Sequence, residues 1–436
     1  VAMCNNTCID MYSKCSSMDG ASQLYRQKME LNVVMCNNAL IDMYAKCGSL
    51  DKATLVFNQM VQKDVVTWNT LITGLMDHGH VEFALLLFCH MLEERVEPDQ
   101  VTFLALVRSA AYGNSYDLGT LMHCFVVEYA IDLLLKIGSA LIDMYVANGS
   151  IYDAQKVFSD MPNRNVVTWT TMLSGYTQCG HSEHAFQVFH QMQQEGLHLD
   201  SIALVGILQA CAATVGLDQG KAVHLYILDD CDEIDAMLGS ALIDMYFKCG
   251  NMECASQVFT KLSSPSGIIW NAMINGYAQH GAHELAIQFF NNMKREGVLP
   301  DSATFISLFS ACSHGGVLED GLLHLQSMLD DYGLVLNLEH YMCLVDLLGR
   351  TGHVKDAESL LQTLPFSPCE VGWRSLMSHC RTLGDVVRGR RCFDHLVRIN
   401  ASEPTAYVLM AEIYGDAGMM EECEKMKRGV PIGTIF

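Results

Sequence analysis

The chain has 436 residues, of which half are hydrophobic and only 17% are charged. This composition excludes an intrinsically disordered chain, and the length predicts several domains or one elongated array. With 27 basic and 49 acidic side chains, the formal net charge is −22, which disfavours generic attraction to nucleic acid or to anionic lipid. No apolar run approaches the roughly 18 residues that a membrane span needs, so no membrane partner is expected.

Two sequence strings recur along the chain at one fixed interval. The string ALIDMY begins at residues 39, 140 and 241, and the string VVTW at residues 65 and 166 has the related GIIW at residue 267. Every interval is 101 residues, and each period divides into units of 31, 35 and 35 residues. Internal repetition at this scale is typical of solenoid proteins.

Within a unit, the spacing of apolar residues predicts two helices. In the unit that begins at Val65, apolar residues recur every three or four positions over 68–75 and again over 81–92. A break lies between them, where equivalent units place Gly79, Gly180 and Gly281. A left-handed residue at that place would close the first helix. Because one such pair cannot bury both apolar stripes, neighbouring pairs must stack, and the predicted fold is an all-α solenoid.

Cysteine is abundant, but its pattern does not predict a disulfide framework or a metal site. Eighteen cysteines include no Cys-x-x-Cys, and they recur at equivalent helical places such as Cys211 and Cys312. We therefore expect free thiols that pack as small hydrophobic side chains in a reducing compartment.

Three short patterns resemble catalytic or metal motifs and are incomplete. The stretch 216–222 is one residue too short for a phosphate-binding loop and lacks its Ser or Thr. The His181-Ser182-Glu183 triplet has no Pro-Cys-x-x-Cys partner, which a zinc deaminase needs, and Cys4 with Cys8 has no complementary pair of ligands. We predict no cofactor, no metal and no catalytic residue, and therefore a protein that is not an enzyme.

The units resemble the pentatricopeptide repeat proteins of plant organelles in which short, standard and long motifs alternate. The sequence WNTLITG from Trp68, with Glu97-Pro98-Asp99 at the end of the unit, resembles the standard motif. The sequence ALIDMY from Ala140, ending in DMPNRN, resembles the short motif. The resemblance implies a right-handed superhelix with a repeat array over 1–337 and a terminal short motif over 338–369. Residues 370–436 are similar to the C-terminal extension motifs of the family, and the last of these looks shortened after Met420.

The array divides into short, standard and long motifs. Short motifs are expected at 2–32, 34–64, 135–165 and 236–266; standard motifs at 65–99, 166–200 and 267–301; and long motifs at 100–134, 201–235 and 302–337. Because the chain starts inside a repeat and without an initiator methionine, we expect its natural N-terminus to lie upstream.

In this family each repeat meets one RNA base, which the side chains at the fifth and last positions of the repeat select. We call these two side chains the junction pair of a repeat. The resemblance implies uridine for Asn38/Asp64, Asn69/Asp99 and Asn271/Asp301, guanosine for Thr170/Asp200, adenosine for Ser139/Asn165, a pyrimidine for Asn6/Asn32 and an uncertain purine preference for Ser240/Ser266. Apolar side chains at the second position, Val66, Val167 and Ile268, would flank the bases.

Other repeats have fifth residues that cannot hydrogen-bond a base, and we expect them to act as spacers. These fifth residues are Leu104, Val205, Ile306 and Met342. The implied RNA site is close to Y-U-U-N-A-G-N-R-U-N-N.

The resemblance implies a binder of single-stranded RNA in a mitochondrion or chloroplast. The extension implies a role in cytidine-to-uridine editing, with a deaminase-domain partner supplying the catalysis in trans. The alternative is a non-catalytic scaffold within an organellar complex, which the acidic balance favours because RNA binders usually neutralise phosphates with Lys and Arg.

Overall fold

The computed structural model confirms the prediction of an all-α fold. It describes residues 33–113, 115–131, 134–230, 234–262, 264–365, 370–400 and 403–429. All regular secondary structure within these ranges is helical, and no helix in them is long and apolar enough to cross a membrane.

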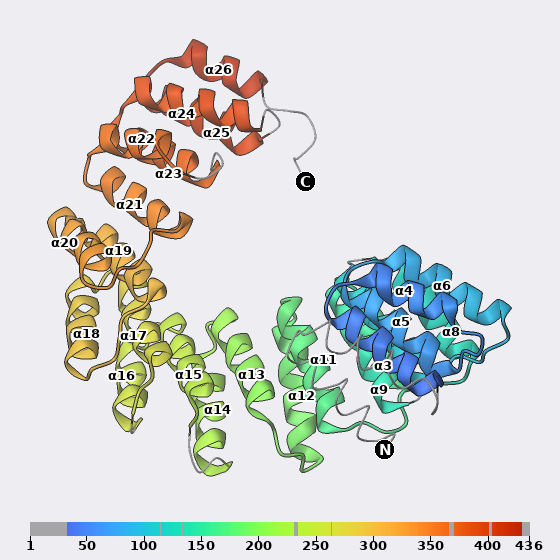
Figure 1. The fold of residues 1–436 in the computed structure, drawn as a ribbon. Coiled ribbons are helices and arrows are strands. Elements are labelled where there is room, and N and C mark those ends of the chain that lie inside the picture. The colour runs from blue at the N-terminus through green and yellow to red at the C-terminus, as the bar shows by residue number, and fades with distance from the viewer. Residues whose placement is uncertain are drawn as a thin grey trace. The chain divides into compact units, whose positions relative to one another are not determined.

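The helices form consecutive pairs, as the repeat pattern predicts (Figure 1). The first helices of the pairs are α3 (Val33–Lys46), α5 (Val65–Asp77), α7 (Gln100–Tyr112), α9 (Leu135–Ala147), α11 (Val166–Gln178), α13 (Ser201–Ala213), α15 (Ala236–Lys248), α17 (Gly267–Gln279), α19 (Ser302–Gly315), α21 (Leu338–Arg350), α23 (Glu370–Leu383) and α25 (Pro404–Asp416). The second helices are α4 (Leu50–Gln59), α6 (Val81–Glu93), α8 (Tyr116–Glu128), α10 (Ile151–Asp160), α12 (Ser182–Gln194), α14 (Leu217–Asp230), α16 (Met252–Lys261), α18 (His283–Arg295), α20 (Leu318–Asp330), α22 (Val354–Gln362), α24 (Val386–Ile399) and α26 (Met420–Arg428).

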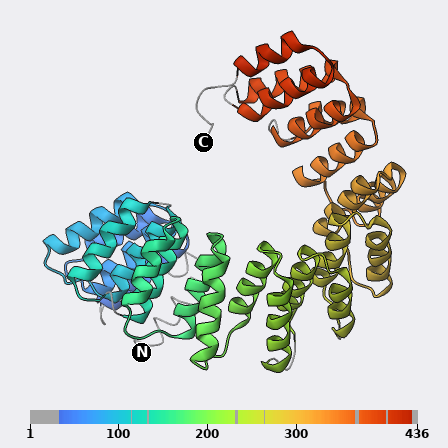
Figure 2. The ribbon, with the colours of Figure 1, turned by 180° about the vertical axis from the view of Figure 1, so that it is seen from behind.

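The chain divides into two compact units, with the boundary between Ala210 and Cys211 inside α13. In the first unit, α5 packs against α3, α6 and α7. In the second unit, α17 packs in the same way against α15, α18 and α19. Within each unit the pairs therefore follow one another as a stack in chain order, which Figure 2 shows from behind.

Glycine closes the first helix of the standard repeats, as the sequence predicts. Gly79 has a φ of 76°, and Gly180 and Gly281 have φ of 75° and 70°. At the end of α5, the Gly79 amide donates to the Met76 carbonyl at 3.0 Å and the His80 amide to the Leu75 carbonyl at 2.9 Å. These two bonds form a Schellman cap, which satisfies carbonyls that the helix end would otherwise leave unpaired.

The core repeats with the 101-residue period. Three buried tryptophans at the start of the standard repeats pack edge-on against a phenylalanine of the preceding second helix. The pairs are Phe57–Trp68, Phe158–Trp169 and Phe259–Trp270, with ring centroids 4.9, 4.7 and 4.6 Å apart. This edge-to-face contact holds each unit that begins with one of these tryptophan helices on the unit before it.

Two of the recurring cysteines lie in this core. Cys211 and Cys312 are fully buried, and burial raises the pKa of each thiol to about 12. Both thiols therefore stay protonated at neutral pH and act as small apolar side chains.

A second glycine position allows consecutive first helices to come close together. Gly74, Gly175 and Gly276 lie in the middle of α5, α11 and α17 and are separated by 101 residues. A Cβ atom at Gly74 would lie 2.4 Å from the Cβ of Ala45 in α3. A Cβ at Gly175 or Gly276 would meet the side chain of Val146 or Phe247 at 2.5 and 2.1 Å. These glycines therefore set the spacing between stacked repeats.

We predict that Gly74→Ala destabilises the protein, although alanine is the better helix former. The overlap with Ala45 can be relieved only by moving backbone, which should cost about 1–3 kcal/mol and exceed the helix-propensity gain of about 1 kcal/mol. Thermal unfolding measures the change. The double variant Gly74→Ala/Ala45→Gly should recover part of the loss, and a single variant as stable as the wild type would contradict this account.

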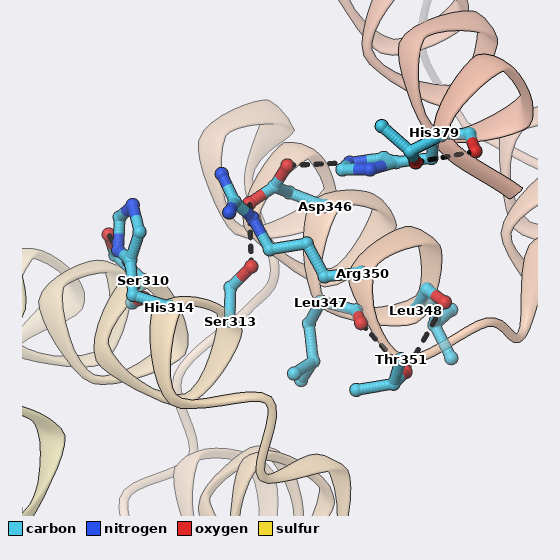
Figure 3. A network of polar contacts seen from close by, with 10 residues as sticks. Ser310, Ser313, His314, Asp346, Leu347, Leu348, Arg350, Thr351 and His379 are labelled. Carbon is cyan, nitrogen blue, oxygen red and sulfur yellow. Dashed lines mark hydrogen bonds and ion pairs between the residues drawn. The ribbon is translucent and has the colours of Figure 1, made fainter. Parts of the chain in front are cut away.

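Asp346 links three first helices of the second unit (Figure 3). Its carboxylate accepts hydrogen bonds from Ser313 of α19 at 2.6 Å, from Arg350 of α21 at 2.9 Å and from His379 of α23 at 2.8 Å. Burial opposes the ionisation of Asp346, but these bonds outweigh it and hold its pKa well below the usual value. The ionised carboxylate thus joins α19 and α21 to α23.

We predict a pH-dependent effect of Asp346→Asn. Because the folded pKa of Asp346 is depressed, its stabilising contribution is full above the unfolded pKa of about 4 and is lost as the pH falls through the folded value. The variant should be about 1–3 kcal/mol less stable at pH 7, and this gap should close in acid. Denaturant unfolding at several pH values measures the gap. Asp42→Asn, which removes an exposed pair with Lys46, should leave stability nearly unchanged at every pH.

Candidate nucleic-acid interface

The predicted junction pairs lie where one repeat meets the next. The fifth residue of a repeat is in the second turn of its first helix, and the last residue is the N-cap of the first helix of the following repeat. Asn69 of α5 thus donates through Nδ2 to Oδ1 of Asp99, the N-cap of α7, at 2.8 Å. Asn271 of α17 donates in the same way to Asp301, the N-cap of α19, at 3.0 Å. The structure therefore brings together residues 30 positions apart in both repeats.

A capping box holds the aspartate of each of these pairs in place. Asp99 Oδ1 accepts hydrogen bonds from the backbone N–H groups of Val101 and Thr102 at 2.9 and 3.0 Å. The backbone N–H of Asp99 donates to the Thr102 hydroxyl at 3.1 Å. Asp301 forms the same box with Thr304. An N-cap of this kind contributes about 1 kcal/mol to helix stability. The aspartate side chains therefore stabilise the helices whether or not a ligand is present.

Two of the capping carboxylates, those of Asp301 and Asp64, are held in the ionised form. Burial raises the pKa of Asp301, but hydrogen bonds from Thr304 and Asn271 outweigh it, so the net shift is downward. Asp64, the N-cap of α5, is shifted in the same direction, with Thr67 and Asn38 as the donors that oppose burial. At neutral pH each carboxylate is therefore an acceptor only.

An open hollow of about 340 Å³ lies beside the Asn69/Asp99 pair. Val66 and Val101, the second residues of two consecutive repeats, line it, and each is 53% exposed. The hollow thus has a polar pair between two apolar side chains, an arrangement that can hold a planar ring by its faces and address its edge.

Sequence reasoning identified Val66 as a flanking side chain but missed Val101. Val101 is the second residue of the repeat 100–134, which we had expected to be silent because of Leu104. A rule that considers the second residue of every repeat would have included Val101. Ile202 and Met237, the second residues of two further repeats, are also exposed. The predicted flanking residues Val167 and Ile268 are 59% and 62% exposed.

The remaining junction pairs differ in how closely they are joined. Asn38 donates to Asp64 at 3.3 Å, and the Thr170 hydroxyl donates to Asp200 at 3.5 Å, the upper limit for a hydrogen bond. Asp200 also caps α13 by accepting the Ala203 N–H at 2.8 Å.

Among the described residues, the two side chains of the Ser139/Asn165 pair and of the Ser240/Ser266 pair do not hydrogen-bond to each other. Ser139 lies 3.2 Å from the Thr168 hydroxyl, which in turn donates to Asn165. Ser240 donates to the backbone carbonyl of Met237, and the buried hydroxyl of Ser266 has no partner among the described residues. The predicted pair of Asn6 and Asn32 lies outside the described residues.

The charge around the described hollow is negative. Asp42, Asp77 and Asp99 line it, and the one lysine there, Lys46, forms an ion pair with Asp42 at 2.7 Å. Over the whole sequence, residues 370–436 hold nine basic and nine acidic side chains, so the formal charge of −22 resides in residues 1–369. A polyanion that enters this hollow needs counterions or cations from elsewhere.

Within the ranges that the structure describes, no group of three or more His, Cys, Asp or Glu residues could hold a metal ion. The stretch 216–222 spans the turn before α14 and the start of that helix, and the helix α13 precedes it. His181 is the N-cap residue of α12 and makes no side-chain cap there.

Comparison with known proteins identifies the family. Residues 63–111, 164–213 and 265–314 match the PPR repeat family, and residues 38–65, 139–166 and 240–264 match the PPR repeat. The chain is 35% identical over 366 residues to a mitochondrial pentatricopeptide repeat-containing protein of Arabidopsis thaliana, covering 83% of this chain and 66% of the relative. It is 35% identical over 339 residues to a chloroplastic one from the same plant, covering 77% and 46%.

A third Arabidopsis thaliana pentatricopeptide repeat-containing protein is 32% identical over 362 residues, which cover 83% of this chain and 76% of the relative. The chain therefore belongs to the pentatricopeptide repeat family. It spans from about half to three quarters of the lengths of these three relatives.

A solved structure supports the fold. The crystal structure of the pentatricopeptide repeat protein PPR10 in complex with an 18-nt psaJ RNA element matches with a TM-score of 0.73 at 20% identity, covering 94% of this chain and 63% of that chain. The α-solenoid predicted from the repeat period is therefore confirmed.

Proposed function

We propose that this chain binds single-stranded RNA in a mitochondrion or chloroplast, with successive repeats contacting successive bases. The observation that carries the proposal is the Asn69/Asp99 pair, fixed by a capping box and open to a hollow between two exposed valines. The RNA-bound PPR10 structure and the mitochondrial and chloroplastic relatives support the ligand and the compartment.

The polar groups of the pair can select a base by its edge. An amide N–H beside a carboxylate oxygen offers one donor and one acceptor, which complements O4 and N3–H of uracil. The Asn271/Asp301 pair offers the same groups. At Thr170/Asp200 the shorter side chain and the 3.5 Å separation leave more room, which favours a purine that presents an acceptor and a donor in the same order, namely guanine.

We further propose that the chain specifies a cytidine-to-uridine editing site and recruits a deaminase-domain protein in trans. The support is the resemblance of residues 370–436 to the extension motifs of the family. In the structure, helices α21 to α26 share one hydrophobic core, which includes Trp373, Phe393 and Tyr414. A protein partner that bound these helices would thus contact a surface supported by the same hydrophobic core as α21 and α22.

A scaffold role is the second candidate, and the acidic hollow favours it. Asp42, Asp77 and Asp99 would repel phosphates, whereas a protein partner with basic side chains would complement them. RNA binding that is specific for one base at one repeat separates the two candidates, because a scaffold has no reason to distinguish bases.

We predict that Thr170→Asn changes the base preference of one repeat from guanosine toward uridine. The variant pair has the same side chains as Asn69/Asp99, so the preference at that nucleotide should change by about 1–3 kcal/mol while the other positions stay unchanged. Binding to a panel of RNAs that differ only at this base measures the effect.

Leu104→Ala, in a repeat with an apolar fifth residue, serves as the control and should leave base preferences unaltered. An unchanged preference in the Thr170→Asn protein would refute the assignment of bases to junction pairs and favour the scaffold.

The editing proposal predicts that the purified chain does not deaminate RNA and that a deaminase-domain partner is needed. Sequencing of the RNA after incubation measures conversion of cytidine to uridine. Conversion should appear when a deaminase-domain protein is added, and Thr170→Asn should lower it on the original RNA and restore it on RNA with the matching base change. Conversion by the chain alone would contradict the proposal.

A further inference from the structure

Thr102 and Thr304, the third residues of the repeats that follow the Asn69/Asp99 and Asn271/Asp301 pairs, contact the amide of the preceding repeat. The Thr102 hydroxyl donates to Asn69 Oδ1 at 2.5 Å, and the Thr304 hydroxyl donates to Asn271 Oδ1 at 2.6 Å. Both threonines are fully buried, so water does not compete for these bonds. Each pair is therefore a triad of amide, carboxylate and hydroxyl.

The chemistry of the triad fixes which way the amide faces. Asp99 Oδ1 accepts two backbone N–H groups, so the amide group next to this oxygen must be the NH₂, and the carbonyl must face Thr102. Rotating the amide by 180° would set its carbonyl against the Asp99 carboxylate and lose both hydrogen bonds. The Asp99 carboxylate and the Thr102 hydroxyl together hold the orientation in which Asn69 offers a donor.

The same arrangement determines what remains for a base. Asp99 Oδ1 accepts from Asn69, Val101 and Thr102, whereas Oδ2 of Asp99 has no partner within the described part of the chain. The second N–H of the Asn69 amide is also unused there. One donor and one acceptor therefore stay available in fixed positions.

Other repeats of the same chain lack this hydrogen bond from a hydroxyl to the asparagine amide, which we call the lock. Thr67 occupies the equivalent position, but its hydroxyl donates to Asp64 at 2.7 Å, and the buried Oδ1 of Asn38 has no partner in the described residues. After the Thr170/Asp200 pair the third residue is Ala203, which has no hydroxyl to offer. The chain thus contains locked and unlocked versions of one site.

We propose that Thr102 and Thr304 are positioning residues that set base selectivity in the preceding repeat by fixing its asparagine amide. The inference rests on the proposed RNA binding. It adds a third residue, contributed by the next repeat, to the Asn69/Asp99 and Asn271/Asp301 pairs. It also ranks the three Asn/Asp pairs by how strictly they select uridine. Uridine should be selected more strictly at the pairs with Asn69 and Asn271 than at the pair with Asn38.

The test removes the hydroxyl at nearly constant shape with Thr102→Val and measures binding to RNAs carrying each of the four bases opposite the 65–99 repeat. Without the hydroxyl, the Asn69 amide loses one of the two hydrogen bonds that fix its orientation, and its carbonyl can turn toward the base. Discrimination for uridine should therefore fall about three- to ten-fold, which corresponds to the free energy of one hydrogen bond. Thr102→Ser keeps the hydroxyl and should keep the discrimination.

Thr67→Val is the matched control, because it also removes a capping-box hydroxyl but one that does not reach an amide. It should lower the unfolding temperature as Thr102→Val does, yet leave base discrimination at the 34–64 repeat unchanged. A purely structural role for Thr102 predicts that both valine variants lose stability and neither loses discrimination, and that result would overturn the inference.

A gain-of-function variant tests the idea without weakening a cap. Ala203→Thr added to Thr170→Asn builds the complete triad in a repeat that lacks it, and uridine discrimination there should exceed that of Thr170→Asn alone. Equal discrimination would count against the lock. If the wild-type chain distinguishes no bases at any repeat, the proposed function itself fails, whereas retained discrimination in Thr102→Val refutes only the role of the threonine.

Discussion

The junctions after the Asn69 and Asn271 repeats depend on one interaction, the capping of the following first helix by the last side chain of the repeat before it. Asp99 and Asp301 satisfy backbone N–H groups that the helix start leaves without partners, and this fixes where α7 and α19 begin. The same carboxylates hold the asparagines of the preceding repeats. The helix start and the polar groups offered to a ligand are therefore coupled through single carboxylates.

This coupling also accounts for part of the acidic composition. Many carboxylates are at fixed positions of the repeat, either as caps such as Asp64 or in helical ion pairs such as Asp42 with Lys46. Negative charge at a helix N-terminus is stabilising, so caps of this type add to the fold while adding to the charge. An acidic solenoid is thus compatible with a ligand that is recognised by its base edges, provided that phosphates stay in solvent with their counterions.

The family resemblance predicted the junction pairs, and the strict period explains why they meet, because it turns spacing along the chain into proximity in space. Asn69 and Asp99 are 30 residues apart, and the helix-turn-helix unit that separates them returns the chain to the adjacent first helix. The second positions were recognised only in part. Val101 was missed because its repeat has Leu104 at the fifth position, although a side chain at a repeat boundary serves the hollow of the preceding repeat as well as its own.

The residues of the junction pairs were predicted from the family resemblance. The sequence by itself determined the helical pairs, their turns at Gly79, Gly180 and Gly281, and the 101-residue period. These follow from local propensity and periodic apolar patterning, which act over a few turns of helix. Only the tertiary structure decided that the Thr102 hydroxyl reaches the Asn69 amide whereas the Thr67 hydroxyl goes to Asp64 instead. Both threonines occupy the same place in the repeat, and the difference depends on how the stacked helices pack, which no local sequence pattern encodes.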